Sequence, residues 1–414
     1  MIDQDTQRKD ASYINRLNKI EVLRLIRESD QISRAAIVKQ TKLSAPTVTR
    51  IVDSLMNDKL AVMVGDGDST GGRPPKLIKF DGTHNYVIGI DLGSTSIRGV
   101  ISNLEGKFIT EIETPTDLKG GAKKVSAQVA QLIDKLINRS KLGDDKILGV
   151  GLAVAGLINI QTGIVEYSPV FNWEKVDLRK ELKKHIDIPV YFDNVSRVTA
   201  LGELLHGVGK KHKNFICVNA GYGIGAGIIV NGARFYGSKG FSGEFGHIVV
   251  NSSSSYVGKD GIKGCLEALA SGYGIAKIAK ERIKAGYKSS ILEVVGGDLD
   301  KITAKTVIDL AKEGDPLATE IFEEAMTYLG HGLDTLIKLM NPEVIVISGG
   351  LTKSGEIFFE KLREHTFENR LKPVEDEVQI LPSSFKEDAT LVGAFSLIIS
   401  KVLQFENGAR NLVS

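Results

Sequence analysis

Cysteine and long apolar runs are the features that this chain most clearly lacks. Its 414 residues include only two cysteines, Cys217 and Cys265. Two thiols exclude a disulfide framework and are too few for a cysteine-rich zinc site. No apolar run approaches the roughly 18 residues that a membrane-spanning helix needs, and the first residues are polar and charged. We therefore expect a cytoplasmic protein without a membrane partner.

An excess of charge of one sign is also missing. The chain has 53 lysines and arginines against 51 aspartates and glutamates, for a formal net charge of +2. Bulk charge therefore does not indicate a polyanionic partner, and any nucleic-acid contact must come from a local group of residues. Hydrophobic residues make up 42% of the chain and charged residues 25%, values that are typical of globular protein.

The residue pattern changes near positions 81–85, after a stretch that has the periodicity of short amphipathic helices. From Tyr86 onward, glycine-punctuated strands alternate with longer helices. A chain of this length is longer than one core usually supports. We predict two domains, over residues 1–83 and 84–414.

The first domain has the pattern of a helix-turn-helix. One apolar stripe predicts a helix over residues 13–28, packed by Leu17, Ile20, Leu23 and Ile26. Ser33 and Ser44 each stand just before a further helical pattern, where N-cap residues are expected. The sequence therefore predicts two short helices joined by a tight turn.

The second of these short helices has a buried and an exposed face. Its apolar stripe consists of Val48, Ile51, Val52 and Leu55. Small and polar side chains at the start of a helix suit the major groove of DNA. We expect DNA contacts from Ser44, Pro46, Thr47, Thr49 and Arg50.

Residues 60–80 alternate apolar and polar positions around a glycine-rich tip, as a β-hairpin wing would. Arg73 lies in that tip, between glycines and prolines. A guanidinium on a narrow backbone can enter the minor groove, where the negative potential is strong. The alternative for the whole module is a helical dimerisation unit with a charged solvent face.

The second domain contains a weak internal repeat. Residues 87–109 and 215–237 both read as an apolar strand, a glycine-rich turn and a second strand. Helical patterns follow each copy, which predicts two α/β lobes that face each other across a cleft. Backbone N–H groups in such turns can face a phosphate, although the same pattern also occurs in simple tight hairpins. The candidate phosphate-binding residues are Asp91, Gly93, Thr95, Gly221 and Gly223.

Four segments together resemble the ROK family of repressors, open reading frames and kinases: STGGRP, FDNVSRVTALGE, GEFGH and GCLE. The resemblance covers nearly the whole chain. It implies an α/β protein in which a winged helix-turn-helix precedes a two-lobed, actin-like (ribonuclease H-like) sugar-kinase fold. Lobe one would span about 84–195 together with a C-terminal helix at 388–404, and lobe two about 196–387.

The resemblance also implies a sugar pocket. Recognition of a sugar needs several hydrogen-bonding groups that converge on neighbouring hydroxyls. Glu244 and His247 are three residues apart, so that in a helical turn they would share a face. By resemblance, the sugar-binding residues are Asn194, Glu244, His247 and Glu267.

Two positions depart from the kinases of this family. Val195 stands where they have the aspartate that removes a proton from the sugar hydroxyl, and loss of a general base typically costs about 10²- to 10⁴-fold in rate. Asp193 precedes the pair of Asn194 and Val195, and a shift along the backbone aims its side chain elsewhere. Tyr222 replaces the threonine of a Gly-Thr-Gly turn and would crowd the nucleotide phosphates. We therefore expect no catalytic residues and no bound ATP.

The zinc site of the family is also incomplete. Its members commonly hold Zn²⁺ with a histidine, here His247, and three cysteines. Only Cys265 remains, and the other two thiols fall at Gly258 and Asp260. One imidazole and one thiolate do not complete a tetrahedral site. We therefore expect neither zinc nor another cofactor.

These features predict a sugar-responsive transcriptional repressor that binds operator DNA as a homodimer or higher homo-oligomer. Its effector would be a monosaccharide or a related polyol, bound by a kinase-like domain without activity. Two alternatives remain open: an active ATP-dependent ROK sugar kinase that also binds DNA, and a scaffold with an empty pocket.

Overall fold

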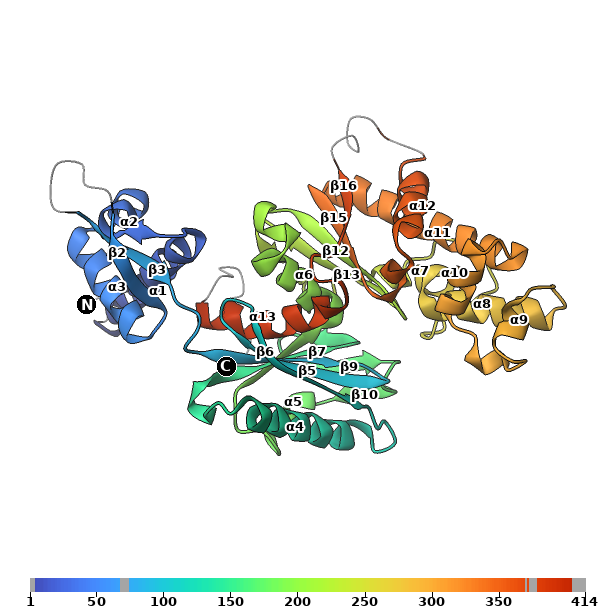
Figure 1. Cartoon of the computed structure of the whole chain (residues 1–414), viewed down its shortest axis with the longest axis horizontal. Helices are drawn as coiled ribbons and strands as arrows, with labels where there is room; N and C mark the ends of the chain where they lie inside the picture. Colours follow the sequence, from blue (N-terminus) through green and yellow to red (C-terminus); the bar gives the residue numbers. More distant parts are fainter. Residues whose placement is uncertain (1–3, 68–73, 369–370, 372–377, 404–414) are drawn as a thin grey trace.

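The computed structural model describes residues 4–67, 74–368, 371 and 378–403. The N-terminal module packs three helices against a small antiparallel sheet of strand order β1-β3-β2 (Figure 1). Its elements are α1 (Gln4–Glu28), β1 (Ile32–Ser33), α2 (Arg34–Thr41), α3 (Ala45–Asn57), β2 (Ala61–Asp66) and β3 (Lys76–Phe80). The predicted wing is confirmed as the β2–β3 hairpin. The first helix was predicted too short, because it begins at Gln4 in a polar segment that carries no apolar stripe.

Both predicted N-caps are confirmed. The Ser33 hydroxyl accepts a hydrogen bond from the Ala36 N–H, and the Ser44 hydroxyl accepts one from the Thr47 N–H. Each bond satisfies a backbone donor that the first helical turn leaves without a partner. The stripe that was predicted for α3 is buried, and it fixes which face of that helix points outward.

Lobe one contains a five-stranded sheet of order β11-β7-β4-β5-β6, with α4 on one face and α13 on the other (Figure 1). Its strands are β4 (Tyr86–Leu92), β5 (Ser96–Asn103), β6 (Phe108–Pro115), β7 (Ile147–Val154) and β11 (Val190–Asn194). A smaller sheet and the helices complete the lobe: β8 (Leu157–Asn159), β9 (Ile164–Ser168), β10 (Trp173–Val176), α4 (Gly121–Ser140), η1 (Asp144–Lys146), α5 (Leu178–Lys183) and α13 (Ala389–Leu403).

Lobe two repeats this topology in a sheet of order β14-β13-β12-β15-β16. Its strands are β12 (Phe215–Ala220), β13 (Ile224–Val230), β14 (Ala233–Arg234), β15 (Val344–Ser348) and β16 (Gln379–Pro382). Its α-helices are α6 (Val195–His206), α7 (Leu266–Ala270), α8 (Gly272–Lys284), α9 (Ile291–Val294), α10 (Ala304–Lys312), α11 (Pro316–Met340) and α12 (Glu356–Thr366). Its short 3-10 helices are η2 (Val208–Lys211), η3 (Phe245–His247), η4 (Leu299–Lys301), η5 (Gly350–Ser354) and η6 (Lys386–Asp388). The weak sequence repeat thus corresponds to β4–β5 and β12–β13, which occupy equivalent places in the two sheets.

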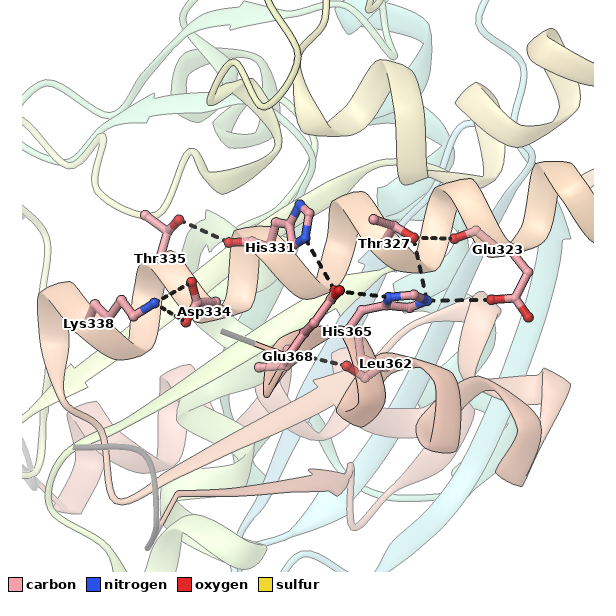
Figure 2. A network of polar contacts seen from close by, with 10 residues as sticks. Glu323, Thr327, His331, Asp334, Thr335, Lys338, Leu362, His365 and Glu368 are labelled. Atoms are coloured by element: carbon pink, nitrogen blue, oxygen red, sulfur yellow. Dashed lines mark hydrogen bonds and ion pairs between the residues drawn. The ribbon is translucent and has the colours of Figure 1, made fainter. Parts of the chain in front are cut away.

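A polar network joins α11 to α12 at the outer side of lobe two (Figure 2). His365 Nε2 lies 3.5 Å from Glu323 Oε2, and Lys361 Nζ lies 2.9 Å from Glu323 Oε1. Glu368 lies between two imidazoles, 3.8 Å from His365 Nδ1 and 3.9 Å from His331 Nε2. These contacts hold α12 in place and lie outside the cleft.

Helix α13 is the central packing element. It lies against both β4 and β7 of lobe one and against α6, and glycines permit this close approach. A Cβ at Gly151 would lie 1.8 Å from the Ala394 carbonyl oxygen, and one at Gly393 would lie 2.1 Å from the Val198 carbonyl oxygen. Neither distance is compatible with a side chain, so both positions require glycine.

The N-terminal module shares a hydrophobic core with lobe one. One cluster of buried side chains joins Val22 and Ile26 of α1 to Leu391 and Phe395 of α13. Phe80, the last residue of β3, belongs to the same cluster. Since this core continues across the junction, the division into 1–83 and 84–414 stays a prediction.

Candidate functional site

A cavity of about 590 Å³ opens between the two lobes. The residues expected to bind sugar all border it, although they come from separate elements: Asn194, Glu244, His247 and Glu267. Asn194 ends β11, Glu244 precedes η3, His247 ends η3, and Glu267 lies in α7. The fold therefore brings this set together, while its role in binding remains a prediction.

The side chain of Asn194 is held on both sides. Its Oδ1 accepts a hydrogen bond from the Ser196 N–H at 2.8 Å, which caps α6, and its Nδ2 donates to the Gly156 carbonyl at 3.0 Å. Gly156 lies just before β8 of lobe one. Asn194 thus fixes the start of α6 relative to lobe one, at the edge of the cavity.

Two carboxyl groups in the cavity are poorly solvated. Burial raises the pKa of Glu244, against the opposing effect of His247. Burial also raises the pKa of Glu267, although its Oε2 accepts a hydrogen bond from the Ile224 N–H at 3.3 Å. Partly desolvated carboxylates form stronger hydrogen bonds with ligand hydroxyls than exposed ones do. This arrangement suits a neutral ligand that is rich in hydroxyl groups.

His247 lies between two acidic side chains. Its Nε2 is 3.5 Å from Glu244 Oε2, and its Nδ1 is 2.5 Å from Asp260 Oδ2. The contact with Asp260 is an ion-pair distance without hydrogen-bond geometry at Nδ1. Sequence reasoning considered Asp260 only as a missing zinc ligand, and its pairing with His247 was not foreseen.

The structure does not place a zinc tetrahedron at the positions that the family uses. A Cβ at Gly258 would lie 2.8 Å from Cys265 Sγ and 2.8 Å from Asp260 Oδ1, so these positions do converge beside His247. However, Gly258 offers no ligand atom, and burial raises the pKa of the Cys265 thiol. Within the described part of the chain, no group of three or more His, Cys, Asp or Glu side chains is arranged to hold a metal ion. The residues present do not fit zinc.

The candidate phosphate-binding residues divide into two groups. Asp91, Gly93 and Gly223 border the cavity, whereas Thr95 and Gly221 are not among its lining residues. The Gly93 N–H donates to the Ser96 carbonyl, and the Gly221 N–H donates to the Gly223 carbonyl. Both N–H groups therefore form hydrogen bonds within their own tight turns. Burial raises the pKa of Asp91 to about 6, against the lowering effect of Arg98.

Val195 and Asp193 lie in different surroundings, at the start of α6 and near the end of β11. Val195 borders the cavity, and its isopropyl group cannot accept a proton. Asp193 is buried and points elsewhere: its Oδ1 accepts from Arg197 Nε at 2.7 Å, and its Oδ2 accepts from Arg234 Nη1 at 2.9 Å. Both carboxylate oxygens are therefore engaged by guanidinium groups.

Tyr222 lies at the turn between β12 and β13 and borders the cavity. The Lys259 ammonium lies 3.7 Å from the centre of its ring, and Tyr273 contacts the ring edge-on at 6.0 Å between centroids. Lys259 borders the same cavity. A phenol ring and an ammonium group thus occupy the region beside the second glycine-rich turn.

The outward face of α3 carries the residues predicted to contact DNA. Ser44, Pro46, Thr49 and Arg50 are exposed, and Thr47 is half-buried, with its hydroxyl 2.8 Å from that of Ser44. Arg50 Nη2 donates to Asn15 Oδ1 of α1 at 2.9 Å. This bond orients the Arg50 guanidinium, a feature that the sequence did not indicate. Arg73 lies outside the described residues.

No helix among the described residues is long and apolar enough to cross a membrane.

The chain is similar in sequence or structure to known repressors and to known kinases. The sequence pattern of the ROK family matches residues 87–401. A xylose repressor from Caldicellulosiruptor bescii is 32% identical over 95% of this chain and 98% of its own length. A glucokinase from Halalkalibacterium halodurans is 31% identical, over 78% of this chain and 98% of its own. A solved ROK-family transcriptional regulator, a homologue of the Escherichia coli MLC protein, superposes with a TM-score of 0.81 at 26% identity, covering 95% of this chain and 97% of that one.

Proposed function

Since this chain belongs to the ROK family, we propose that it is a sugar-responsive transcriptional repressor that binds operator DNA through its winged helix-turn-helix. One observation carries this proposal: the similarity to a repressor extends over the N-terminal module, whereas the similarity to a glucokinase covers 78% of this chain. That module presents a capped helix whose exposed face is small, polar and basic, as a major-groove reader requires.

The effector binds in the cavity between the lobes. Asn194, Glu244, His247 and Glu267 supply donors and acceptors for neighbouring hydroxyls. The relatives named as xylose repressors make D-xylose the first ligand to test.

Phosphoryl transfer is not part of this function. Val195 provides no base for the acceptor hydroxyl, and Tyr222 with Lys259 fills the region beside the second phosphate turn. The protein therefore acts without ATP. It also acts without zinc, because Gly258 supplies no ligand atom beside His247, Asp260 and Cys265.

Ligand binding reaches the DNA-binding module through two helices. Asn194 caps α6, α6 packs on α13, and α13 shares a core with α1 and β3. Closure of the lobes on a sugar shifts the start of α6. This shift changes the position of α13, on which the DNA-binding module packs. Coupling of this kind amounts to about 1–3 kcal/mol, or roughly a 5- to 150-fold change in operator affinity. The operator-binding form is a homodimer or a higher homo-oligomer, since operators are commonly two-fold symmetric.

The test selects binding sequences from a random DNA library and then measures affinity with and without D-xylose and a panel of other monosaccharides and inositols. We expect a specific sequence whose affinity changes at least 5-fold with one sugar. Glu244→Ala is expected to abolish the sugar response while DNA affinity is kept. A protein that selects no DNA sequence, or that makes sugar phosphate at ordinary enzymatic rates, would refute the proposal.

A further inference from the structure

The cavity has more room and more aromatic surface than a single sugar ring uses. We propose that it contains a second subsite, bordered by Tyr222 and Tyr167, and that the effector is an uncharged disaccharide. This inference rests on the proposed function and specifies its ligand class.

The predicted sugar-binding groups occupy one part of the cavity. His247 Nε2 is 3.5 Å from Glu244 Oε2, and the Glu267 carboxylate is anchored to the Ile224 N–H. Groups this close to one another converge on the hydroxyls of one ring. The whole cavity measures about 590 Å³, within the range of about 300–1,000 Å³ in which proteins hold drug-sized ligands. Space therefore remains beyond the first ring.

Two accessible aromatic side chains border the rest of the cavity. Tyr222 is 59% exposed and Tyr167 is 39% exposed, and both border the cavity. Pro169 and Val170 extend this apolar surface. A saccharide ring presents C–H groups on its faces and hydroxyls at its edge, so an aromatic ring can pack on one face while the hydroxyls stay hydrated. Exposed aromatic side chains around a hollow are typical of binding surfaces.

The two tyrosines belong to different lobes. Tyr167 lies in β9 of lobe one, and Tyr222 follows β12 of lobe two. A second ring between them contacts both lobes, so it favours the closed cleft more than a single ring does. The longer ligand is therefore expected to bind more tightly and to produce the stronger effect on DNA binding.

The charged groups that border the cavity disfavour an anionic ligand. Four carboxyl groups border the cavity, against one ammonium group, that of Lys259, which already lies over the Tyr222 ring. The four carboxyl groups are those of Asp91, Glu244, Asp260 and Glu267. A sugar phosphate would bring a further negative group beside these carboxyl groups, with unfavourable electrostatic energy. The preferred ligand is therefore a neutral sugar.

The experiment measures dissociation constants by calorimetry on the full-length protein. The probes are D-xylose with xylobiose, D-glucose with cellobiose, maltose and sucrose, and glucose 6-phosphate. At least one disaccharide is expected to bind about tenfold more tightly than its own monosaccharide, which corresponds to about 1.4 kcal/mol. The inference is overturned when a monosaccharide binds but no disaccharide binds more tightly, or when the phosphate binds best. Binding of no saccharide at all would instead overturn the proposed function.

Variants at position 222 locate the second ring. Tyr222→Ala is expected to reduce the disaccharide-to-monosaccharide affinity ratio to near one, while Tyr222→Phe keeps the ratio because packing depends on the ring and not on the hydroxyl. Tyr287→Ala is the matched control, since Tyr287 is 55% exposed and lies outside the cavity. An unchanged ratio in Tyr222→Ala would show that the second ring does not lie there.

Discussion

Nε of Arg197 donates a hydrogen bond to Oδ1 of Asp193 at 2.7 Å, and both side chains are almost completely buried. Arg234 Nη1 binds the other oxygen of the same carboxylate at 2.9 Å. Asp193 is the next-to-last residue of β11 in lobe one, whereas Arg197 and Arg234 belong to α6 and β14 of lobe two. One buried carboxylate thus joins the lobes beside the cleft.

Replacement of that carboxylate is expected to destabilise the protein strongly. Asp193→Asn removes the carboxylate charge that two buried guanidinium groups contact, and breaking a buried ion pair in this way costs about 3–5 kcal/mol. Denaturant unfolding measures the loss. Asp187→Asn, a change at an exposed aspartate near the start of β11, is the control and should cost less than about 0.5 kcal/mol. Equal stabilities of the two variants would contradict the role assigned to Asp193.

Arg50 is expected to contribute directly to DNA affinity. Arg50→Ala should weaken operator binding by about 1–3 kcal/mol, because a guanidinium on the exposed start of α3 is lost, and sugar affinity should stay the same. Fluorescence anisotropy with labelled operator DNA measures the change. Lys123→Ala, at an exposed position on α4, serves as the matched loss of one positive charge. If both variants bind operator DNA equally well, α3 is not the reading helix.

Position 195 is expected to limit phosphoryl transfer. The wild-type protein should give no measurable sugar phosphate in a coupled assay with ATP, Mg²⁺ and a sugar panel. The combination Val195→Asp with Tyr222→Thr should give turnover at least about 100-fold above the detection limit of the assay, since a general base contributes about 10² to 10⁴. Val195→Asn with the same second change supplies no base and should remain inactive. Wild-type turnover in the usual range of about 1–10³ s⁻¹ would show an active kinase.

The carboxyl group of Asp91 is expected to make stability depend on pH. Burial raises its pKa from 3.8 to about 6, so the folded state holds this proton more tightly than the unfolded state does. The contribution of Asp91 to the free energy of unfolding is therefore largest below about pH 4 and is lost as the pH rises through about 6. The loss amounts to up to about 3 kcal/mol, at 1.36 kcal/mol per pKa unit.

Comparison with Asp91→Asn isolates this contribution, because the other titrating groups are shared by both proteins. The variant should gain stability relative to the wild type between pH 4 and pH 7, as measured by denaturant unfolding at each pH. A constant difference across that range would mean that Asp91 does not have a raised pKa.

Local features of this protein followed directly from its sequence. The caps at Ser33 and Ser44, the buried stripe of α3, the hairpin wing and the paired strand–turn–strand units depend on residues within a few positions of one another. Helical and strand periodicity therefore predicted them. The set around Asn194 and Glu244 was predicted only through resemblance to a family, since single residues of this kind are common on protein surfaces.

Other features were decided by tertiary structure. The contact between Asp260 and His247, the placement of Asp193 between two arginines, and the exclusion of Thr95 and Gly221 from the cavity lining depend on where distant segments meet. The core shared by α1, β3 and α13 joins the two ends of the chain. Spacing along a sequence carries no information about such contacts, because their energies depend on distance, burial and orientation in the folded molecule.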